Sequence, residues 1–248
     1  MVSVHRYHEI SEASHRILNP LTRAQLELLG EICSLGPGMR QLDLASGKGE
    51  MLCQYAARHG TSGVGVDVYQ PYIEASNARA RELGVEDKVR FVAGDAGSYD
   101  DEPSSYDVVS CIGATWIGGG LEGALRLMRR WVERRGWLLV GEPYWIESPP
   151  PDVRAALEAT QTFADLGGTL ERFAAAGMDL VEMVLADAGT WDRYAASQWL
   201  NVADWLRANP DDPEAAEVRQ IRDRSRASYL QHDRRCLGWG VFVLRLGE

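Results

Sequence analysis

Gln41-Leu-Asp-Leu-Ala-Ser-Gly-Lys-Gly-Glu50 and the following Val64-Gly-Val-Asp-Val68 are the stretches that decide the fold. Each is an apolar run typical of a strand; the first ends in a turn of small residues, and the second ends in a carboxylate. Parallel strands deliver their last residues to one edge of a sheet, where a small-residue turn lets a ligand approach the backbone. The acid Asp67 can accept hydrogen bonds from both hydroxyls of a ribose. These stretches therefore predict a site for a ligand that carries a nucleoside.

Two common nucleotide-binding motifs do not fit this turn. A dinucleotide fingerprint starting at Gly47 requires glycine at position 52, which is Leu52. A P-loop requires Gly-Lys-Ser/Thr after the turn, and none follows. The spacing therefore disfavours a nicotinamide-dependent oxidoreductase and a P-loop enzyme.

Asp43-Leu-Ala-Ser-Gly-Lys-Gly49 resembles the first motif of the class I, Rossmann-like methyltransferases that depend on S-adenosylmethionine (SAM). In that family the first strand ends in Asp/Glu-x-Gly-x-Gly-x-Gly. Ala45 stands where the family usually has its first glycine, and it adds one methyl group beside the ligand. The resemblance implies SAM as cofactor and S-adenosylhomocysteine (SAH) as its product.

Three later segments match the family in order. Asp67 lies 24 residues beyond Asp43, Phe91-Val-Ala-Gly-Asp95-Ala96 ends a third strand, and Tyr106–Ile112 forms a fourth. The resemblance implies that Asp67 meets the ribose, Asp95 and Ala96 meet the adenine, and the end of the fourth strand meets the methionine part of SAM. For Asp67 and Asp95 the alternative role is to cap a helix or a loop. The implied cofactor site consists of Asp43, Ala45, Ser46, Gly47, Gly49, Asp67, Val68, Asp95, Ala96, Ile112 and Gly113.

The alternation of apolar runs and helical patterns predicts an α/β fold. We expect a Rossmann-like, mostly parallel sheet of seven strands with helices on both faces and an antiparallel last strand. The predicted strands are residues 40–45, 63–67, 89–92, 106–112, 136–142, 179–186 and 237–246. The predicted helices between the first strands are residues 50–59, 71–83 and 120–134.

We expect a single domain over residues 1–248, with an N-terminal arm and helix at 1–35 and a SAM-binding core at 36–147. Residues 187–236 exceed what the sheet needs and predict a helical lid between strands six and seven. The pattern there indicates two helices broken at Asn209-Pro-Asp-Asp-Pro213. A further elaboration opens with Ser148-Pro-Pro-Pro151.

The acceptor side is less well marked. Glu142 and Tyr144 end the fifth strand, so they are candidates to contact the acceptor, with Glu142 as a general base. Anchoring a loop is the alternative for Glu142, and His5, His8, His15 and His232 are other candidates for proton transfer. Predicted substrate-binding aromatics are Trp116, Trp145, Trp191, Tyr194 and Trp199, and packing within the protein is their alternative role.

Composition limits the partners. The net charge of −10 disfavours a broad nucleic-acid-binding face. The sequence contains no run of about 18 apolar residues, so we expect no membrane span. The polar N-terminus lacks the apolar core of a signal peptide, and we therefore expect a cytoplasmic protein. Cys33, Cys53, Cys111 and Cys236 are far apart and suggest neither zinc nor disulfides, with Cys53 and Cys111 expected as buried thiols. We expect no metal, and oligomeric state stays open.

The resemblance implies an enzyme of the EC 2.1.1 type that transfers a methyl group from SAM to an acceptor by in-line displacement, and the composition favours a small molecule as that acceptor. The blocks at 111–120 and 141–145 resemble uncharacterised bacterial small-molecule methyltransferases. One alternative is a SAM enzyme of the same fold with a non-methylating reaction. Another is a degenerate binding subunit, which only Ala45 favours.

Overall fold

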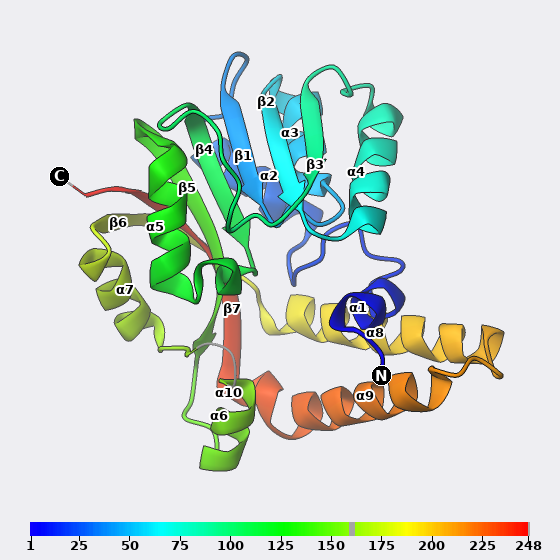
Figure 1. Cartoon of the computed structure of the whole chain (residues 1–248). Coiled ribbons are helices and arrows are strands. Elements are labelled where there is room, and N and C mark those ends of the chain that lie inside the picture. Colours follow the sequence, from blue (N-terminus) through cyan, green and yellow to red (C-terminus); the bar gives the residue numbers. More distant parts are fainter. Residues whose placement is uncertain (159–161, 248) are drawn as a thin grey trace.

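A seven-stranded mixed sheet forms the centre of the computed structural model, which describes residues 1–158 and 162–247 (Figure 1). The strand order is β3-β2-β1-β4-β5-β7-β6, and β7 runs antiparallel to both of its neighbours. This confirms the predicted fold class. Residues 159–161 and 248 of the expected single domain lie outside the described residues. The strands are β1 (Arg40–Leu44), β2 (Ser62–Asp67), β3 (Val89–Ala93), β4 (Tyr106–Ile112), β5 (Val132–Trp145), β6 (Met178–Leu185) and β7 (Leu237–Leu246).

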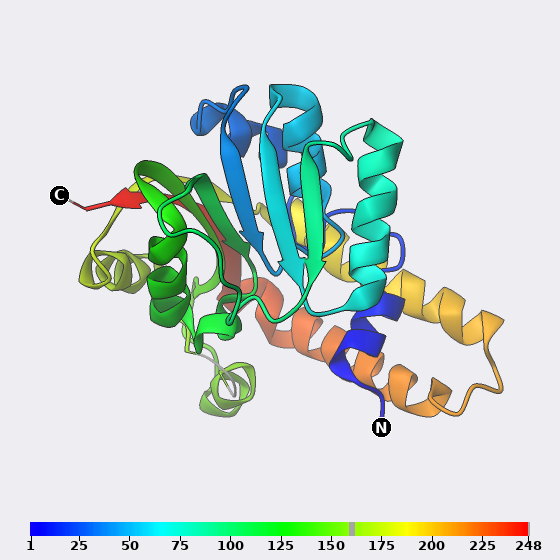
Figure 2. The same cartoon turned by 45° about the horizontal axis from the view of Figure 1, so that its top comes forward.

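Helices cover both faces of the sheet, and a group of helices lies beyond its carboxyl edge (Figures 1 and 2). The α-helices are α1 (Val4–Ser11), α2 (Arg23–Ile32), α3 (Glu50–His59), α4 (Gln70–Leu83), α5 (Leu121–Trp131), α6 (Pro151–Leu157), α7 (Leu166–Ala175), α8 (Ala188–Ala208), α9 (Ala215–Ser228) and α10 (Arg234–Cys236). A 3-10 turn, η1 (Thr115–Gly118), follows β4, and a π-helical turn, η2 (Tyr229–Asp233), follows α9.

The predicted bounds of the fifth strand, 136–142, are wrong at both ends, since β5 also continues to Trp145. The helix expected at 120–134 ends at Trp131, and β5 begins at Val132 instead of residue 136. The polar residues 133–135 resemble the end of a helix, but they are exposed and belong to an irregularity in the strand pairing. Tyr106 pairs with Val132, whereas Val108 pairs with Trp137.

The main core lies between the sheet and α5. Buried apolar residues on α5 recur at helical spacing, so one stripe faces the strands. That stripe consists of Leu121, Ala124, Leu125, Met128 and Trp131. On the opposite face, α2 and α3 pack against β4, β5 and β7, and α4 packs with α3 against β3. The sheet is therefore buried on both faces, as its parallel strands require.

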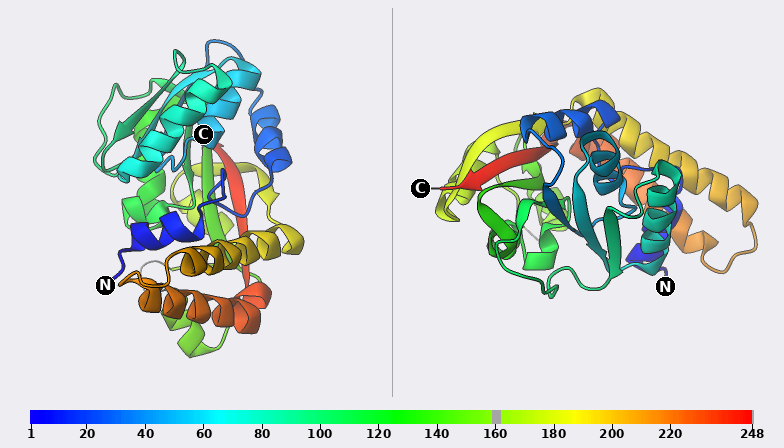
Figure 3. Two further views of the ribbon diagram at one scale, coloured as in Figure 1. Left: turned by 90° about the vertical axis from the view of Figure 1, so that its right-hand side faces the viewer. Right: turned by 90° about the horizontal axis from the view of Figure 1, so that it is seen from above.

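A separate cluster holds α1, α8 and α9 together. Its members are Val2, Ile10, Val202, Leu206, Ala215 and Val218. Figures 1 and 3 show the N-terminal helix next to the pair formed by α8 and α9, which it crosses. Helices α8 and α9 confirm the two-helix interpretation of residues 187–236, with the break at 209–213. Because this group has its own apolar cluster, the N-terminal arm and the insertion form one structural unit.

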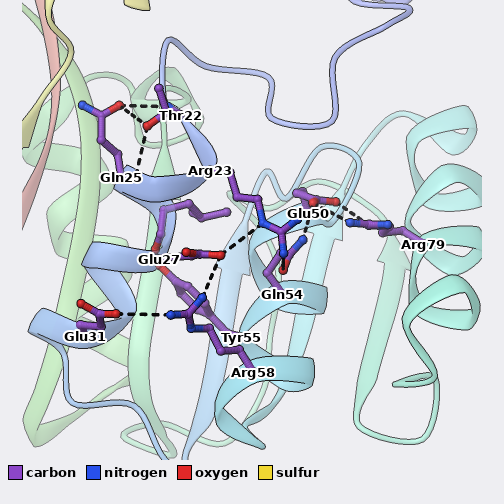
Figure 4. Close-up of polar contacts among 11 residues, drawn as sticks. Thr22, Arg23, Gln25, Glu27, Glu31, Glu50, Gln54, Tyr55, Arg58 and Arg79 are labelled. Carbon is purple, nitrogen blue, oxygen red and sulfur yellow. Dashed lines mark hydrogen bonds and ion pairs between the residues drawn. The ribbon is translucent and has the colours of Figure 1, made fainter.

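Two ion pairs join the helices on one face of the sheet in very different surroundings (Figure 4). Arg79 of α4 forms a forked pair with Glu50 of α3, at 2.7 and 2.9 Å, and both side chains are at least nine-tenths buried. Arg58 Nη1 lies 2.8 Å from Glu27 Oε1, but the Arg58 side chain is 46% exposed. Burial makes the first pair a structural requirement, whereas solvent screens the second.

We expect Arg79→Met to lower the free energy of unfolding by about 3 kcal/mol, because it leaves the buried Glu50 carboxylate without its counter-charge. Arg58→Met, the same change in an exposed pair, is expected to cost less than about 1 kcal/mol. Urea denaturation at neutral pH measures both. Equal costs for the two variants would contradict this assignment.

Candidate functional site

A cavity of about 730 Å³ opens at the carboxyl edge of the sheet. Its floor is formed by the ends of β1 to β4, and its roof by the N-terminal residues and α8. The cavity is lined by every residue predicted for the cofactor except Gly49: Asp43, Ala45, Ser46, Gly47, Asp67, Val68, Asp95, Ala96, Ile112 and Gly113. The structure thus gathers four segments that lie up to 70 residues apart, while Gly49 caps α3.

The turn after β1 has a left-handed backbone. Ala45 has φ 58° and Gly47 has φ 55°. Such a conformation costs an alanine about 1 kcal/mol more than a glycine, which explains why glycine suits position 45. The Ser46 amide donates to the Val66 carbonyl at 3.0 Å, so β2 holds the turn in place. The turn is therefore built in spite of the departure at Ala45.

Asp67 joins this turn to the end of β2. Its Oδ2 accepts from the Gly47 amide at 2.8 Å, and its Oδ1 accepts from the Tyr69 amide at 2.9 Å. Burial raises the pKa of Asp67, and the two amides oppose that rise. Each carboxylate oxygen can accept a second hydrogen bond. Asp67 can therefore cap the backbone locally and still bind hydroxyls in the cavity.

Asp43 and Asp95 complete a row of carboxylates along the edge. Asp43 Oδ1 accepts from Ser110 Oγ at 2.7 Å, and burial raises the pKa of Asp43 to about 7. Asp95 Oδ1 accepts from the Gly97 amide at 2.9 Å in a tight turn. Both residues still line the cavity. The row offers hydrogen-bond acceptors to a ligand rich in hydroxyl and amino groups.

Two hydroxyl groups of the lining residues have no hydrogen-bond partner within the described residues. They are Ser46 Oγ in the turn and Tyr72 OH at the start of α4, and both atoms are buried. A buried hydroxyl without a partner is costly, so both groups lower the stability of the site as it stands in this structure. The row of Asp43, Asp67 and Asp95 along the cavity fits a ligand with hydroxyl and amino groups, such as a nucleoside.

The predicted aromatic residues divide into two groups. Trp116, Trp191 and Tyr194 line the cavity, whereas Trp145 and Trp199 do not. Trp145 Nε1 instead donates to Glu158 Oε1 at 3.0 Å, and the Trp199 ring packs edge-on against Tyr229. Trp191 and Tyr194 are three residues apart on α8 and so share one face. On α8, helical spacing and not aromatic content decides which side chains face the cavity.

Glu142 and Tyr144 lie outside the cavity lining, whereas Pro143 between them belongs to it. Because side chains alternate along β5, Glu142 and Tyr144 point to the face of the sheet opposite to that of Pro143. Glu142 Oε2 accepts from Thr115 Oγ1 at 2.8 Å, and Tyr144 packs near Phe242 in the main core. Their contact with an acceptor stays a prediction that this geometry disfavours. The alternative, loop anchoring by Glu142, agrees with the contact to Thr115.

The N-terminal segment contributes lining residues that sequence reasoning missed. Among them are Glu12, Leu18 and Asn19, and the turn adds Lys48. Asn19 Nδ2 donates to the Ile112 carbonyl at 3.3 Å, which places this segment over the end of β4. No motif or spacing marks Glu12, Leu18 and Asn19, whereas Lys48 lies within the Asp43–Gly49 motif but was not singled out. Of the four candidate histidines, His5 and His8 line the cavity, and His15 and His232 do not.

The structure also bears on the cysteines, on metal ligands and on membrane-spanning helices. The four cysteines are buried and free, which confirms the expected state of Cys53 and Cys111. Among the described residues, no group of His, Cys, Asp or Glu side chains is arranged to hold a metal ion. In the same part of the chain, no helix is both long and apolar enough to cross a membrane.

Known proteins resemble this chain along nearly its whole length. A family model described as a methyltransferase domain matches residues 42–136. An uncharacterized Escherichia coli protein, YjhP, is 43% identical over 246 residues, which cover 98% of this chain and 99% of YjhP. A SAM-dependent methyltransferase from Geobacter sulfurreducens, solved with SAH, is 44% identical, with 99% and 100% coverage and a TM-score of 0.92. A counterpart from Thiobacillus denitrificans, also solved with SAH, is 43% identical, with 97% and 98% coverage and a TM-score of 0.90.

Glu142 makes folding depend on pH. Burial raises the pKa of Glu142 to about 7, with Thr115 and Arg172 opposing the rise and Glu122 adding to it. A raised carboxyl pKa means that the folded state holds the proton more tightly, so stability falls as pH rises through the window that ends near 7.

We expect Glu142→Gln to raise the free energy of unfolding at pH 8 by about 2–3 kcal/mol, because the amide removes the cost of burying a charge. At pH 5 the gain is expected to fall below about 1 kcal/mol, since wild-type Glu142 is then mostly protonated when folded. Urea denaturation at both pH values measures the difference. Glu133→Gln, on the exposed part of the same strand, is the control. A gain that does not change with pH would contradict the assignment.

Proposed function

This chain belongs to the family of SAM-dependent methyltransferases, and on that premise we propose that it transfers a methyl group from SAM to a small-molecule acceptor. The observation that carries the proposal is the row of Asp43, Asp67 and Asp95 along one cavity at the carboxyl edge of the sheet. Ligands of open α/β sheets bind at this edge. The relatives from Geobacter and Thiobacillus were solved with SAH, which supports the same cofactor here.

In the proposed complex the Asp67 carboxylate accepts hydrogen bonds from the ribose hydroxyls. The Asp95 side chain and the Ala96 amide bind the adenine. The turn at 45–47 and the backbone of Ile112 and Gly113 enclose the methionine part. These roles match the order of the segments along the edge of the sheet, from β3 through β2 and β1 to β4.

SAM supplies a methyl group that is already activated on a sulfonium. The protein therefore has to align the acceptor and exclude water. The roof formed by the N-terminal residues and α8 serves both tasks, since Leu18, Trp191 and Tyr194 reach the cavity from it. A general base is required only for an acceptor that must lose a proton.

The lining favours a small acceptor with an apolar, planar part. Trp116, Trp191 and Trp239 supply aromatic surface, and Asn19 and Gln198 supply hydrogen bonds. The net charge of −10 disfavours a nucleic-acid acceptor. We extend the proposal to the organisation of the chain: one domain, with residues 1–35 and 187–236 closing over a core at 36–147.

We expect Asp67→Ala to weaken SAH binding at least tenfold, about 1.4 kcal/mol, because the ribose loses its carboxylate partner and the Gly47 amide of the turn loses its acceptor. Isothermal titration calorimetry on the purified protein measures the dissociation constant, and we expect micromolar binding by the wild type. Asp107→Ala is the matched control. Asp107 lies at the other end of the sheet, where its Oδ2 accepts from the Arg40 amide at 2.7 Å, so it should bind SAH as the wild type does.

Two results would count against the proposal. A folded wild-type protein that binds no SAH would contradict the enzyme assignment and favour a degenerate binding subunit. Equal SAH affinity in Asp67→Ala and Asp107→Ala would leave the cofactor in place but contradict the ribose site at Asp67.

A further inference from the structure

Residues 12–19, which we call the strap, cross the cavity between α1 and the segment that leads to α2. They form neither helix nor strand. Glu12, Leu18 and Asn19 of the strap nevertheless line the cavity. Because no regular backbone ladder holds the strap, contacts with its neighbours must fix its position.

Lys48 makes the contact on the side of the sheet. It lies in the turn after β1, and its ammonium group donates to the Glu12 carbonyl at 2.7 Å and to the His15 carbonyl at 2.9 Å. Hydrogen bonds from a charged donor are stronger than neutral ones. The same turn carries Ser46 and Gly47, which line the cavity floor. One side chain therefore ties the floor of the proposed cofactor site to its roof.

Helix α8 holds the strap from the other side. Tyr194 OH lies 2.5 Å from Glu12 Oε1 and 2.9 Å from the Leu18 carbonyl. Gln198 Nε2 donates to Glu12 Oε1 at 3.1 Å, and His15 Nε2 lies 2.6 Å from Ser197 Oγ. The strap is thus clamped between Lys48 below and α8 above. It cannot lift away from the cavity without breaking one set of these bonds.

We propose that Lys48 is a positioning residue that fastens the strap over the cofactor, so that closing the roof and retaining the cofactor are one coupled event. This inference rests on the proposed cofactor site. Lys48 acts through Glu12 and His15, and Asn19 ties the other end of the strap to the Ile112 carbonyl at the end of β4. A ligand that enters or leaves under the strap must break both bonds from Lys48.

The chain offers an unusually clean control. Lys48 and Lys88 are its only lysines, and Lys88 is exposed next to β3. Lys48→Met keeps an unbranched side chain of similar volume, one atom shorter, but removes all its donors, whereas Lys48→Arg keeps a charged fork that can reach two carbonyls. Lys88→Met makes the same chemical change away from the strap.

The first experiment combines SAH calorimetry with hydrogen exchange of residues 12–19 in the SAH-bound protein. We expect Lys48→Met to bind SAH about tenfold more weakly and to exchange faster in the strap. Lys48→Arg should restore most of both, and Lys88→Met should match the wild type. Wild-type affinity together with wild-type strap protection in Lys48→Met would overturn the proposal.

The second experiment reads Lys48 directly, by acetylation with acetic anhydride and mass spectrometry of the wild-type protein. Burial lowers the pKa of Lys48, which by itself would speed its acetylation. Slow labelling of Lys48 would therefore report its enclosure by the strap, and slow labelling is what we expect. SAH should slow the labelling of Lys48 further and leave the labelling rate of Lys88 unchanged. Tyr194→Phe, which loosens the strap from the side of α8, should speed labelling of Lys48 alone. Equal labelling of both lysines in every state would contradict the fastening role.

Failure of this inference can be told apart from failure of the proposed function. A wild-type protein that binds no SAH contradicts the function. In that case the hydrogen-exchange rates of residues 12–19 can still be measured without ligand and compared between Lys48→Met and Lys88→Met. Faster exchange of the strap in Lys48→Met alone supports the fastening by Lys48, and identical exchange overturns it.

Discussion

The hydrogen bond from the Gly47 amide to the Asp67 carboxylate is the contact on which the site depends. It joins the turn after β1 to the end of β2, and Ser76 Oγ of α4 adds a second link at 3.0 Å to the Gly47 carbonyl. The turn can then hold its left-handed backbone, including the strained Ala45. With the turn fixed, Ser46 and Lys48 lie between the strand ends and the N-terminal segment. Geometry at one turn thus organises both floor and roof.

The roof obeys a different constraint. Helices α1, α8 and α9 bury an apolar cluster of their own, and Trp191 of α8 also packs against the cluster that α2 and α3 form with the sheet. They meet the core through polar contacts of the strap and through residues that line the cavity. The division suits a site that must admit two ligands and then exclude water from both.

The sequence predicted the sheet, and it predicted most of the residues that line the sheet side of the cavity, for a physical reason. Strand periodicity and a turn that needs small residues are local properties, so Asp43, Gly47, Asp67 and Asp95 carry their signal in their immediate neighbours. The boundary of β5 was missed because an irregular strand pairing placed polar residues where a helix end was expected. The hydrophobic pattern of a short stretch of sequence does not indicate an irregularity in the pairing between two strands.

The acceptor side could not be predicted in the same way. Which face of β5 Glu142 occupies depends on strand register, and Pro143 occupies the cavity side instead. The contacts of Glu12 with Tyr194 and Gln198 join residues more than 180 positions apart. No motif spacing encodes contacts that only the packing of α1 against α8 creates.

The central claim is that this chain moves a methyl group from SAM to a small molecule held beneath the roof. The most direct measurement incubates the protein with SAM labelled in its methyl group and a panel of planar hydroxyl- and amine-bearing compounds, with mass spectrometry of all products. The account predicts that SAH accumulates only when an acceptor is present and that the label is found in that acceptor. Consumption of SAM without SAH, or turnover of an added compound with no label in it, would contradict methyl transfer and favour a non-methylating reaction on the same fold.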